Sequence, residues 1–460
     1  MGEHAARLPC FKAYDVRGVV PDELDEARAY AIGRAYAAVV RPDRVAVGRD
    51  VRLSSEALAE ALSRGLNDGG VDVVDLGLCG TEQVYFATFH LGLGGGIMVT
   101  ASHNPAEYNG MKFVRERAIP ISGDSGLDAI EGRVRAGRFG SPASRGKTRR
   151  LDITEQYVNH LMSYVDAPAL KPLTVACNPG NGCAGPVLRH IAERIPCRLR
   201  LLYEEPDGCF PHGVPNPLLP ENRSATAQWV RSCVADLGVA WDGDFDRCFF
   251  FDEHGNFIEG YYVVGLLAEA VLRREPGAKI IHDPRLVWNT VEIVARLGGR
   301  PICSKTGHAF IKERMRAEDA AYGGEMSAHH YFRRFGYCDS GMIPWLLVAD
   351  ILSREERPLS QLVADRIERY PVSGEINRRL ENPQAALARI EAVYGKEALN
   401  IDRTDGISME FPAWRFNVRT SNTEPLLRVN VEARGDRTLM EEKTAELLAL
   451  IDKVAEGSAA

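Results

Sequence analysis

The feature that most restricts the fold of this chain is a succession of strand, turn and helix that occurs three times. Apolar runs begin at Val45, Val175 and Ile280, and a polar turn follows each of them. After each turn comes a stretch of helical period, at about 54–66, 184–195 and 289–297. Strands that alternate with helices form parallel or mixed sheets covered on both faces, so the repeat predicts three α/β domains.

The last part of the chain departs from this repeat. A helical stretch at 383–394 precedes alternating runs at 406–410 and 426–432, and a final helix is expected at 439–454. Alternation of apolar and polar residues favours antiparallel strands, which predicts a smaller α+β domain. We therefore expect an α/β fold of three similar domains with mixed sheets and a smaller fourth domain, arranged around a central cleft. The expected ranges are 1–147, 148–252, 253–368 and 369–460, with a linker at 136–150.

Composition narrows the possible partners and surroundings. The 460 residues carry a formal charge of −7 without a long block of either sign, which argues against nucleic acid or a membrane as a partner. Ten cysteines without C-x-x-C spacing favour a reduced, cytoplasmic protein. The most apolar long stretch, at 261–272, is too short to span a bilayer. Nothing in the sequence indicates an oligomeric state.

The polar loop at 242–247 carries three aspartates on alternate positions: Asp242, Asp244 and Asp246. Three carboxylates this close repel one another unless a cation lies among them, and hard oxygen donors favour a divalent metal. A solvated acidic turn is one alternative, but the apolar residues on both sides favour a buried edge. An EF-hand loop is another, but Arg247 stands where that loop needs glycine. The loop therefore predicts a metal site at the carboxyl edge of a strand, where α/β sheets bind ligands.

A second polar loop, at 100–105, contains Ser102. No G-x-S-x-G sequence surrounds this serine, which argues against a hydrolase triad. Its hydroxyl could instead carry a phosphoryl group if a metal and cations neutralise the charge in transfer. Taken alone, the Ser-His-Asn-Pro sequence favours an ordinary turn, because Ser, Asn and Pro are typical turn residues.

Four motifs in order resemble the signatures of the α-D-phosphohexomutase superfamily, one in each expected domain: 100–105, 242–247, 324–327 and 419–425. The segment 11–18 resembles the superfamily's amino-terminal segment, and the whole chain is similar to its bacterial phosphomannomutase branch. Arg285 stands where many relatives carry lysine, and Ala328 where glycine is common, but both match this branch.

The resemblance implies a role for each polar loop. Ser102 would become the phosphoserine, and the three aspartates would hold Mg²⁺ against its phosphate. Catalytic roles are expected for Ser102, Lys112, Arg247 and His329, with Lys112 and His329 both open as the group that takes the hydroxyl proton. For His308, an ordinary loop position is as plausible as direct chemistry. The substrate-binding residues implied are Tyr14, Arg17, His103, Arg285, Gly307, His308, Glu325, Ser327, His329, Arg419, Ser421, Asn422 and Thr423.

The implied reaction interconverts mannose 6-phosphate and mannose 1-phosphate through a hexose 1,6-bisphosphate, which would also act as activator, and supplies GDP-mannose synthesis. The partners would be small hexose phosphates. A dual phosphoglucomutase/phosphomannomutase and a phosphoglucosamine mutase remain alternatives, because mannose and glucose differ only at C2. From other classes, a metal-dependent sugar phosphatase or a non-catalytic sugar-phosphate binding protein would have to be distinguished by assay.

Overall fold

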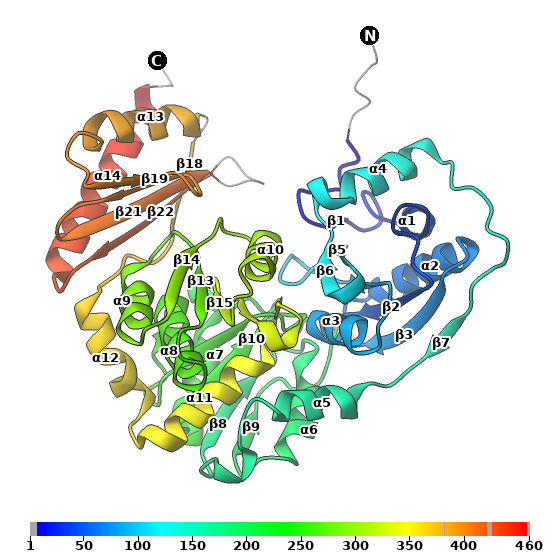
Figure 1. Cartoon of the computed structure of the whole chain (residues 1–460), viewed down its shortest axis with the longest axis horizontal. Helices are drawn as coiled ribbons and strands as arrows, with labels where there is room; N and C mark the ends of the chain where they lie inside the picture. The colour runs from blue at the N-terminus through cyan, green and yellow to red at the C-terminus, as the bar shows by residue number, and fades with distance from the viewer. Residues whose placement is uncertain (1–6, 381, 421–425, 458–460) are drawn as a thin grey trace. The chain divides into compact units, whose positions relative to one another are not determined.

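The computed structural model describes residues 7–380, 382–420 and 426–457 (Figure 1). Its internal contacts divide the chain into two units. The first unit comprises residues 1–257 and 329–356, and the second comprises residues 258–328 and 357–460. Each unit contains sheets and a hydrophobic core of its own.

The first sheet of the first unit is mixed, with the strand order β1-β5-β4-β2-β3-β7. The strands β2, β3, β4 and β7 run parallel, β1 and β5 run antiparallel to their neighbours, and β6 pairs with β5. The bounds are β1 (Val16–Val19), β2 (Arg44–Arg49), β3 (Asp72–Leu78), β4 (Gly95–Val99), β5 (Tyr108–Arg115), β6 (Ile119–Pro120) and β7 (Thr148–Arg150).

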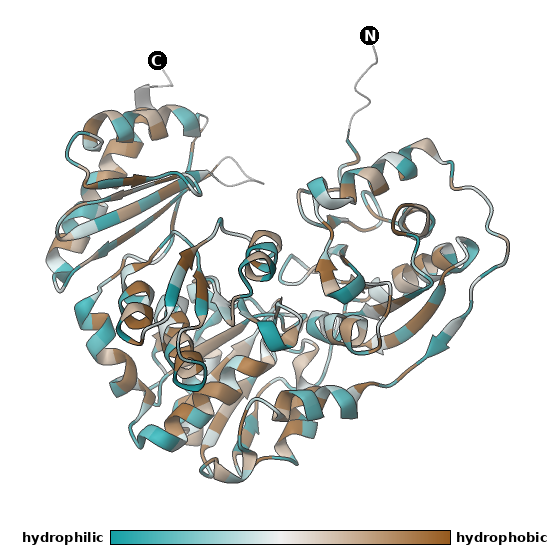
Figure 2. Cartoon of the chain, in the orientation of Figure 1, coloured by the Kyte–Doolittle hydropathy of each residue, from teal (hydrophilic) through white to brown (hydrophobic). Residues whose placement is uncertain are grey.

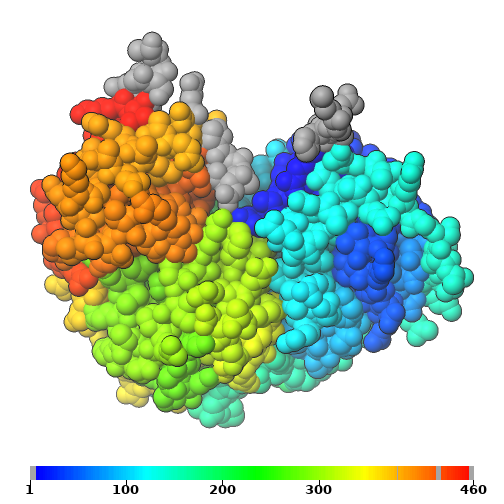
Figure 3. All heavy atoms as spheres, turned by 45° about the horizontal axis from the view of Figure 1, so that its top comes forward, coloured from blue at the N-terminus to red at the C-terminus, as the bar shows by residue number. Residues whose placement is uncertain are grey.

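Helices pack on both faces of this sheet. Val45 and Val47 of β2 belong to the core beneath α1 and α2, whereas Gly48 lies against Val84 of α3 on the other face. Asp25 caps α1 by accepting a hydrogen bond from the Arg28 amide at 2.7 Å. In the space-filling view α4 (cyan) lies beside the blue N-terminal region, and α4 contacts α1 (Figure 3). The bounds are α1 (Glu26–Val40), α2 (Ser55–Asp68), α3 (Thr81–His90) and α4 (Leu127–Ala136).

The second sheet of this unit has the order β11-β10-β8-β9, with β12 beyond β11. The strands β8, β9 and β10 are parallel and β11 is antiparallel to β10. Most residues of both central strands are apolar and buried, and the apolar stretches are brown in Figure 2. The bounds are β8 (Thr174–Asn178), β9 (Arg198–Leu201), β10 (Leu237–Trp241), β11 (Cys248–Phe251), β12 (Phe257–Ile258), α5 (Thr154–Met162), α6 (Ala184–Ala192) and α7 (Ser224–Cys233).

Residues 329–356 complete the first unit with two short antiparallel strands and a helix. The helix is almost entirely buried and packs against β11. The bounds are β16 (His330–Phe332), β17 (Cys338–Asp339) and α11 (Met342–Glu355), and the short 3-10 turns of the unit are η1 (Glu116–Ala118), η2 (Gly123–Ser125), η3 (Ala167–Ala169), η4 (Pro220–Asn222) and η5 (Arg333–Phe335).

The second unit begins with an α/β segment in which β13 lies between β14 and β15, all parallel. Since parallel strands end at the same edge, the residues after β13 and β15 lie close together. The bounds are α8 (Gly260–Arg274), β13 (Lys279–His282), α9 (Trp288–Arg296), β14 (Arg300–Cys303), α10 (His308–Glu318), β15 (Tyr322–Gly324) and α12 (Leu359–Arg369).

The C-terminal part of this unit is an antiparallel sheet of order β18-β22-β21-β20-β19. The helices α13 and α14 pack on each other and on β21 and β22, and together they enclose one core. The bounds are β18 (Ile376–Arg379), α13 (Pro383–Tyr394), β19 (Asn400–Asp402), β20 (Ile407–Glu410), β21 (Trp414–Thr420), β22 (Leu426–Ala433) and α14 (Arg437–Gly457).

The expected α/β fold with a smaller α+β domain is confirmed, and the expected helices lie within a few residues of their predicted positions. One expectation is corrected: Thr148–Arg150, assigned to a linker, forms the edge strand β7, which pairs in parallel with β3. Its three side chains are exposed, so no pattern of buried residues signals the strand. Among the helices described, none combines the length and the apolar character that crossing a membrane requires.

Candidate active site

The loop after β4 holds Ser102 in an unusual backbone conformation. Its φ is +50°, in the left-handed region that residues other than glycine rarely adopt. The Ser102 amide donates to Thr100 Oγ1 at 2.8 Å, which supports this turn. The hydroxyl is buried and donates to Asp242 Oδ2 at 2.8 Å. Strain of this kind collects at functional positions, where the surrounding contacts maintain it.

The three aspartates follow β10 directly and converge within the first unit. One carboxylate oxygen from each lies within 4.8 Å of the others, and all three side chains are buried. Asp244 Oδ1 and Asp246 Oδ1 are buried without a hydrogen-bond partner. Orphaned carboxylate oxygens are costly in a protein interior unless a cation binds them, so the loop fits a divalent metal bound through oxygen.

Glycine at position 243 permits the close approach of the two loops. A Cβ atom there would lie 2.7 Å from the carbonyl oxygen of Ser102. The backbone of Gly243 therefore packs directly on the backbone of the serine loop. This contact sets the distance between the serine hydroxyl and the aspartates.

Lys112 supplies the positive charge nearest to the aspartates. It projects from β5, and its Nζ donates to Asp244 Oδ2 at 2.7 Å and to Asp246 Oδ2 at 2.5 Å. Burial opposes the charge, but Asp244 and Asp246 outweigh it and raise the pKa of Lys112 above its usual value. Burial and repulsion by Asp244 raise the pKa of Asp246. Lys112 is thus held as an ammonium ion in this arrangement.

Two further cations border the serine loop. Arg247 Nε donates to Asp242 Oδ2 at 2.9 Å, and its Nη2 contacts His103 Nδ1. Burial, reinforced by Arg247, lowers the pKa of His103 well below its usual value, so this ring is neutral. Arg17 donates to the Ala101 carbonyl at 2.6 Å. Tyr14, also expected at the site, precedes β1 and is half-buried.

His329 also lies in this unit, close to the aspartates. Its Nδ1 is 2.9 Å from Asp339 Oδ2, and one oxygen each of Asp246 and Asp339 lies within 4.8 Å of it. Asp339 was not anticipated, and it follows no recognisable motif. A carboxylate this close to Nδ1 favours the tautomer that carries its proton there, which leaves Nε2 as the acceptor.

Thr81, at the start of α3, is another contact of the aspartate loop that sequence reasoning missed. Its Oγ1 donates to Asp244 Oδ2, and its amide donates to the Asp244 carbonyl at 3.1 Å. Beside it, the buried Glu82 accepts hydrogen bonds from Tyr157, Ser340 and the amides that begin α11. The first turn of α3 therefore fixes the aspartate loop to the rest of the unit.

In the second unit, the expected sugar-binding residues lie after β13 and β15. Arg285 is buried and binds Asp283 through two hydrogen bonds, at 3.0 and 2.9 Å. The same guanidinium donates to Ser327 Oγ at 3.2 Å and lies 3.6 Å from Glu325. Burial opposes ionisation of Asp283, but Arg285 outweighs it and lowers the pKa of that carboxyl.

Glu325 connects this group to the start of α10. Its Oε1 accepts a hydrogen bond from the Gly307 amide at 2.9 Å. His308 is the first residue of α10 and is half-buried. The structure therefore places Gly307 and His308 beside the expected sugar-binding carboxylate.

Arg419 lies at the end of β21 with a second arginine directly opposite. Arg428 of β22 is its cross-strand partner, and both guanidiniums contact Glu375, at 2.9 and 3.2 Å. Buried Nε atoms of both arginines lack a hydrogen-bond partner. Like charges opposite each other destabilise a sheet, so this pair favours an anion. The other expected phosphate ligands, Ser421, Asn422 and Thr423, lie outside the described residues.

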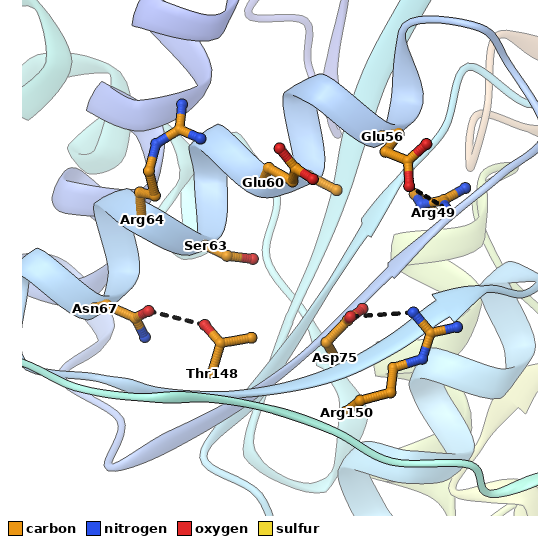
Figure 4. A pocket seen from close by; sticks show the side chains of 10 residues that line it. Arg49, Glu56, Glu60, Ser63, Arg64, Asn67, Asp75, Thr148 and Arg150 are labelled. Atoms are coloured by element: carbon orange, nitrogen blue, oxygen red, sulfur yellow. Dashed lines mark hydrogen bonds and ion pairs between the residues drawn. The ribbon is translucent and has the colours of Figure 1, made fainter.

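A prominent surface cavity lies elsewhere in the first unit (Figure 4). It has a volume of about 310 Å³ and lies between α2 and the strands β2, β3 and β7. Charged residues on its wall pair with each other, Arg49 with Glu56 at 2.8 Å and Arg150 with Asp75 at 3.2 Å. None of the expected site residues lines it. The buried polar cluster around Ser102, with its orphaned oxygens, is the better candidate.

The fold and the serine beside a loop of three aspartates define a known class of protein. Four domain models described as phosphoglucomutase/phosphomannomutase match in order: α/β/α domain I at 9–141, domain II at 155–255, domain III at 259–370 and the C-terminal domain at 375–449. The chain belongs to the phosphoglucomutase/phosphomannomutase family.

Individual relatives are similar over nearly the whole length. A phosphomannomutase of Escherichia coli is 60% identical over 453 residues, which are 97% of this chain and 99% of the relative. A protein of Xanthomonas campestris named phosphohexose mutases is 58% identical, covering 96% and 99%. A crystal structure of a phosphoglucomutase/phosphomannomutase family protein from Burkholderia thailandensis has a TM-score of 0.87 at 32% identity, covering 97% and 98%.

Proposed function

We propose that this chain is a phosphomannomutase that interconverts mannose 6-phosphate and mannose 1-phosphate, with Ser102 as its phosphoserine. The observation that carries the proposal is the hydrogen bond from Ser102 Oγ to Asp242 Oδ2, 2.8 Å long, at the edge of three convergent aspartates. The relatives named phosphomannomutase, which match almost end to end, support the choice of substrate.

In this proposal the metal is Mg²⁺, held by Asp242, Asp244 and Asp246 together with the phosphate on Ser102. When bound, it neutralises charge on the phosphoryl oxygens and makes the serine oxygen a better leaving group. Lys112 and Arg247 supply the fixed positive charge on either side. Both are buried, so water screens their charges little.

The proton of the attacking sugar hydroxyl goes to His329 in this proposal. Two carboxylates hold Lys112 as an ammonium ion, which favours His329 over Lys112 as the acceptor of this proton. Asp339 beside His329 Nδ1 leaves Nε2 of the ring available for that proton. Tyr14, Arg17 and His103 then contribute to binding of the substrate near the serine loop.

The second unit binds the rest of the substrate. Arg419, assisted by Ser421, Asn422 and Thr423, holds the phosphate that is not reacting, and Arg428 adds a second charge. Glu325 and Ser327 bind sugar hydroxyls, and Arg285, Gly307 and His308 keep these groups in place. The sugar 1,6-bisphosphate formed by the first transfer turns round, and its other phosphate returns to Ser102. A hexose 1,6-bisphosphate therefore also acts as activator of the unphosphorylated enzyme.

We further propose that the enzyme acts in the cytoplasm, supplies GDP-mannose synthesis and has small hexose phosphates as its partners. The domain ranges 1–147, 148–252, 253–368 and 369–460 are part of the same proposal. A dual phosphoglucomutase/phosphomannomutase is the second candidate, favoured by the name of the Xanthomonas campestris relative.

The test is an assay of purified protein with mannose 1-phosphate, glucose 1-phosphate and glucosamine 1-phosphate, each with glucose 1,6-bisphosphate and Mg²⁺. We expect the highest kcat/KM with mannose 1-phosphate and phosphate on Ser102 by mass spectrometry. Equal kcat/KM for the glucose ester would favour the dual enzyme. Release of inorganic phosphate without sugar isomerisation would replace the mutase with a phosphatase.

A further inference from the structure

Arg52 binds the backbone of the serine loop with both terminal nitrogens of its guanidinium group. It lies in the turn between β2 and α2 (Figure 1) and is 2% exposed. Four carbonyl oxygens of the loop accept hydrogen bonds from it: Pro105 at 2.7 Å and Tyr108 at 2.8 Å from Nη1, and Ser102 at 3.1 Å and Asn104 at 2.6 Å from Nη2. The loop from 102 to 108 therefore curls around one side chain.

The arginine is itself held firmly in its turn. Asp50 accepts a hydrogen bond from the Arg52 amide at 3.0 Å, and its Oδ2 lies 3.3 Å from Arg52 Nε. Ser55 donates to the same carboxylate. The ring centroid of Phe210 is 5.4 Å from the guanidinium carbon and covers its face. Because Asp50 and Phe210 hold the guanidinium in place, its N–H donors fix the positions of the loop carbonyls that bind them.

An arginine suits this task better than any other cation. Its planar fork offers five N–H donors in fixed directions, whereas a lysine offers three donors from one point. Carbonyl oxygens that converge on one centre repel one another unless a cation lies among them. Without that cation the loop would relax, and Ser102 would lose the support for its positive φ.

We propose that Arg52 is a positioning residue, which holds the Ser102 loop in the geometry needed for phosphoryl transfer. It acts through the backbone and is not proposed to touch the substrate. The inference rests on the proposed function, because it assumes that Ser102 carries the phosphoryl group. Arg17 supports the same loop from another side, through the Ala101 carbonyl and Asn104 Oδ1.

The test compares Arg52→Lys and Arg52→Met with the wild type and with Arg49→Lys. Arg49 is a matched control, because it ends β2 close by but pairs with Glu56 at the surface. The rate of Ser102 phosphorylation by glucose 1,6-bisphosphate, the steady-state kcat and KM, and amide hydrogen exchange are measured on the intact protein. Amide hydrogen exchange measures the opening of the serine loop in both the phosphorylated and the unphosphorylated protein, so this measurement does not depend on activity.

Displacing a reacting group by about 1 Å costs on the order of a hundredfold in rate. We therefore expect phosphorylation and kcat to fall together by about that factor in Arg52→Lys, with KM changed less than about threefold. Exchange should accelerate at residues 102–108 and stay unchanged elsewhere. In Arg52→Met the phosphorylation rate and kcat should fall at least as far, and in Arg49→Lys the two rates and the hydrogen exchange should equal those of the wild type.

Normal phosphorylation in Arg52→Lys, or unchanged exchange at 102–108, would overturn the role of Arg52. So would accelerated exchange throughout the first unit, because the residue would then be a general structural support. Absence of phosphate on Ser102 in the wild type would refute the proposed function instead. The two failures are therefore distinguishable.

Discussion

Replacing Lys112 by methionine removes the cation that lies among the aspartates in the absence of a metal. Methionine keeps much of the length and apolar volume of the stem, so the lost ammonium is the main change. Lys112 Nζ contacts Asp244 at 2.7 Å and Asp246 at 2.5 Å, and all three groups are buried. Removing one partner of a buried ion pair costs about 3–5 kcal/mol, because it leaves uncompensated charge.

We expect the thermal unfolding temperature of the metal-free Lys112→Met protein to fall by several degrees. Saturating Mg²⁺ should recover most of that loss, because a bound cation takes over the neutralisation of the carboxylates. Scanning calorimetry with and without Mg²⁺ measures both shifts. Lys147→Met is the control, since Lys147 is exposed in the same unit. If Mg²⁺ stabilised the variant no more than the wild type, the reasoning about a shared cation position would be refuted.

Three further predictions concern the first unit. Gly243→Ala should lower kcat about a hundredfold and also lower the unfolding temperature, because its Cβ would lie 2.7 Å from the Ser102 carbonyl oxygen and one of the two backbones must shift. Gly132→Ala meets nothing within 4 Å and should be fully active. Glu82→Ala leaves the Ser340 hydroxyl and the Gly341 amide buried without their acceptor. The free energy of unfolding, measured in urea, should therefore fall by about 3 kcal/mol or more, and it should fall less in Glu82→Gln. Burial, and Arg334 beside it, lower the pKa of His160 to about 4, so the unfolded state takes up a proton first as the pH falls. Stability should therefore drop between about pH 6.5 and 4, by about 1–2 kcal/mol after allowing for solvent screening, and His160→Phe should abolish this part of the drop.

Periodicity and motif order anticipated the fold and the loops that carry the candidate site. The helical pattern at 383–394 coincides with α13, and the apolar run before Asp242 coincides with β10. These features depend on neighbours in sequence, which is why sequence alone predicts them. The edge strand β7 was missed because its stability comes from backbone pairing with β3 and not from buried side chains.

The supporting residues of the site could not be predicted in the same way. Thr81 contacts Asp244, which lies 163 positions away in the sequence, and the residues next to Thr81 in the sequence do not predict that contact. Glu375 gains its role only because Arg285, Arg419 and Arg428 approach it in the folded chain. Arg52 follows a strand, which is a common place for a site residue. Its partners are backbone carbonyl groups, however, and because every residue has one, no sequence pattern predicts this contact.

Because Phe210 packs on the guanidinium of Arg52, a fluorescent dye attached next to Phe210 would report on this contact. Cys209 is the neighbour of Phe210 and is exposed, whereas the other cysteines are buried or half-buried. Burial raises the pKa of several of those thiols, for example that of Cys79 to about 12, which suppresses their reaction with alkylating dyes. A dye attached under mild conditions should therefore enter at Cys209. Its fluorescence would respond to movement of the segment around Phe210 away from Arg52. The rate of that movement during turnover could therefore be measured without introducing any new residue.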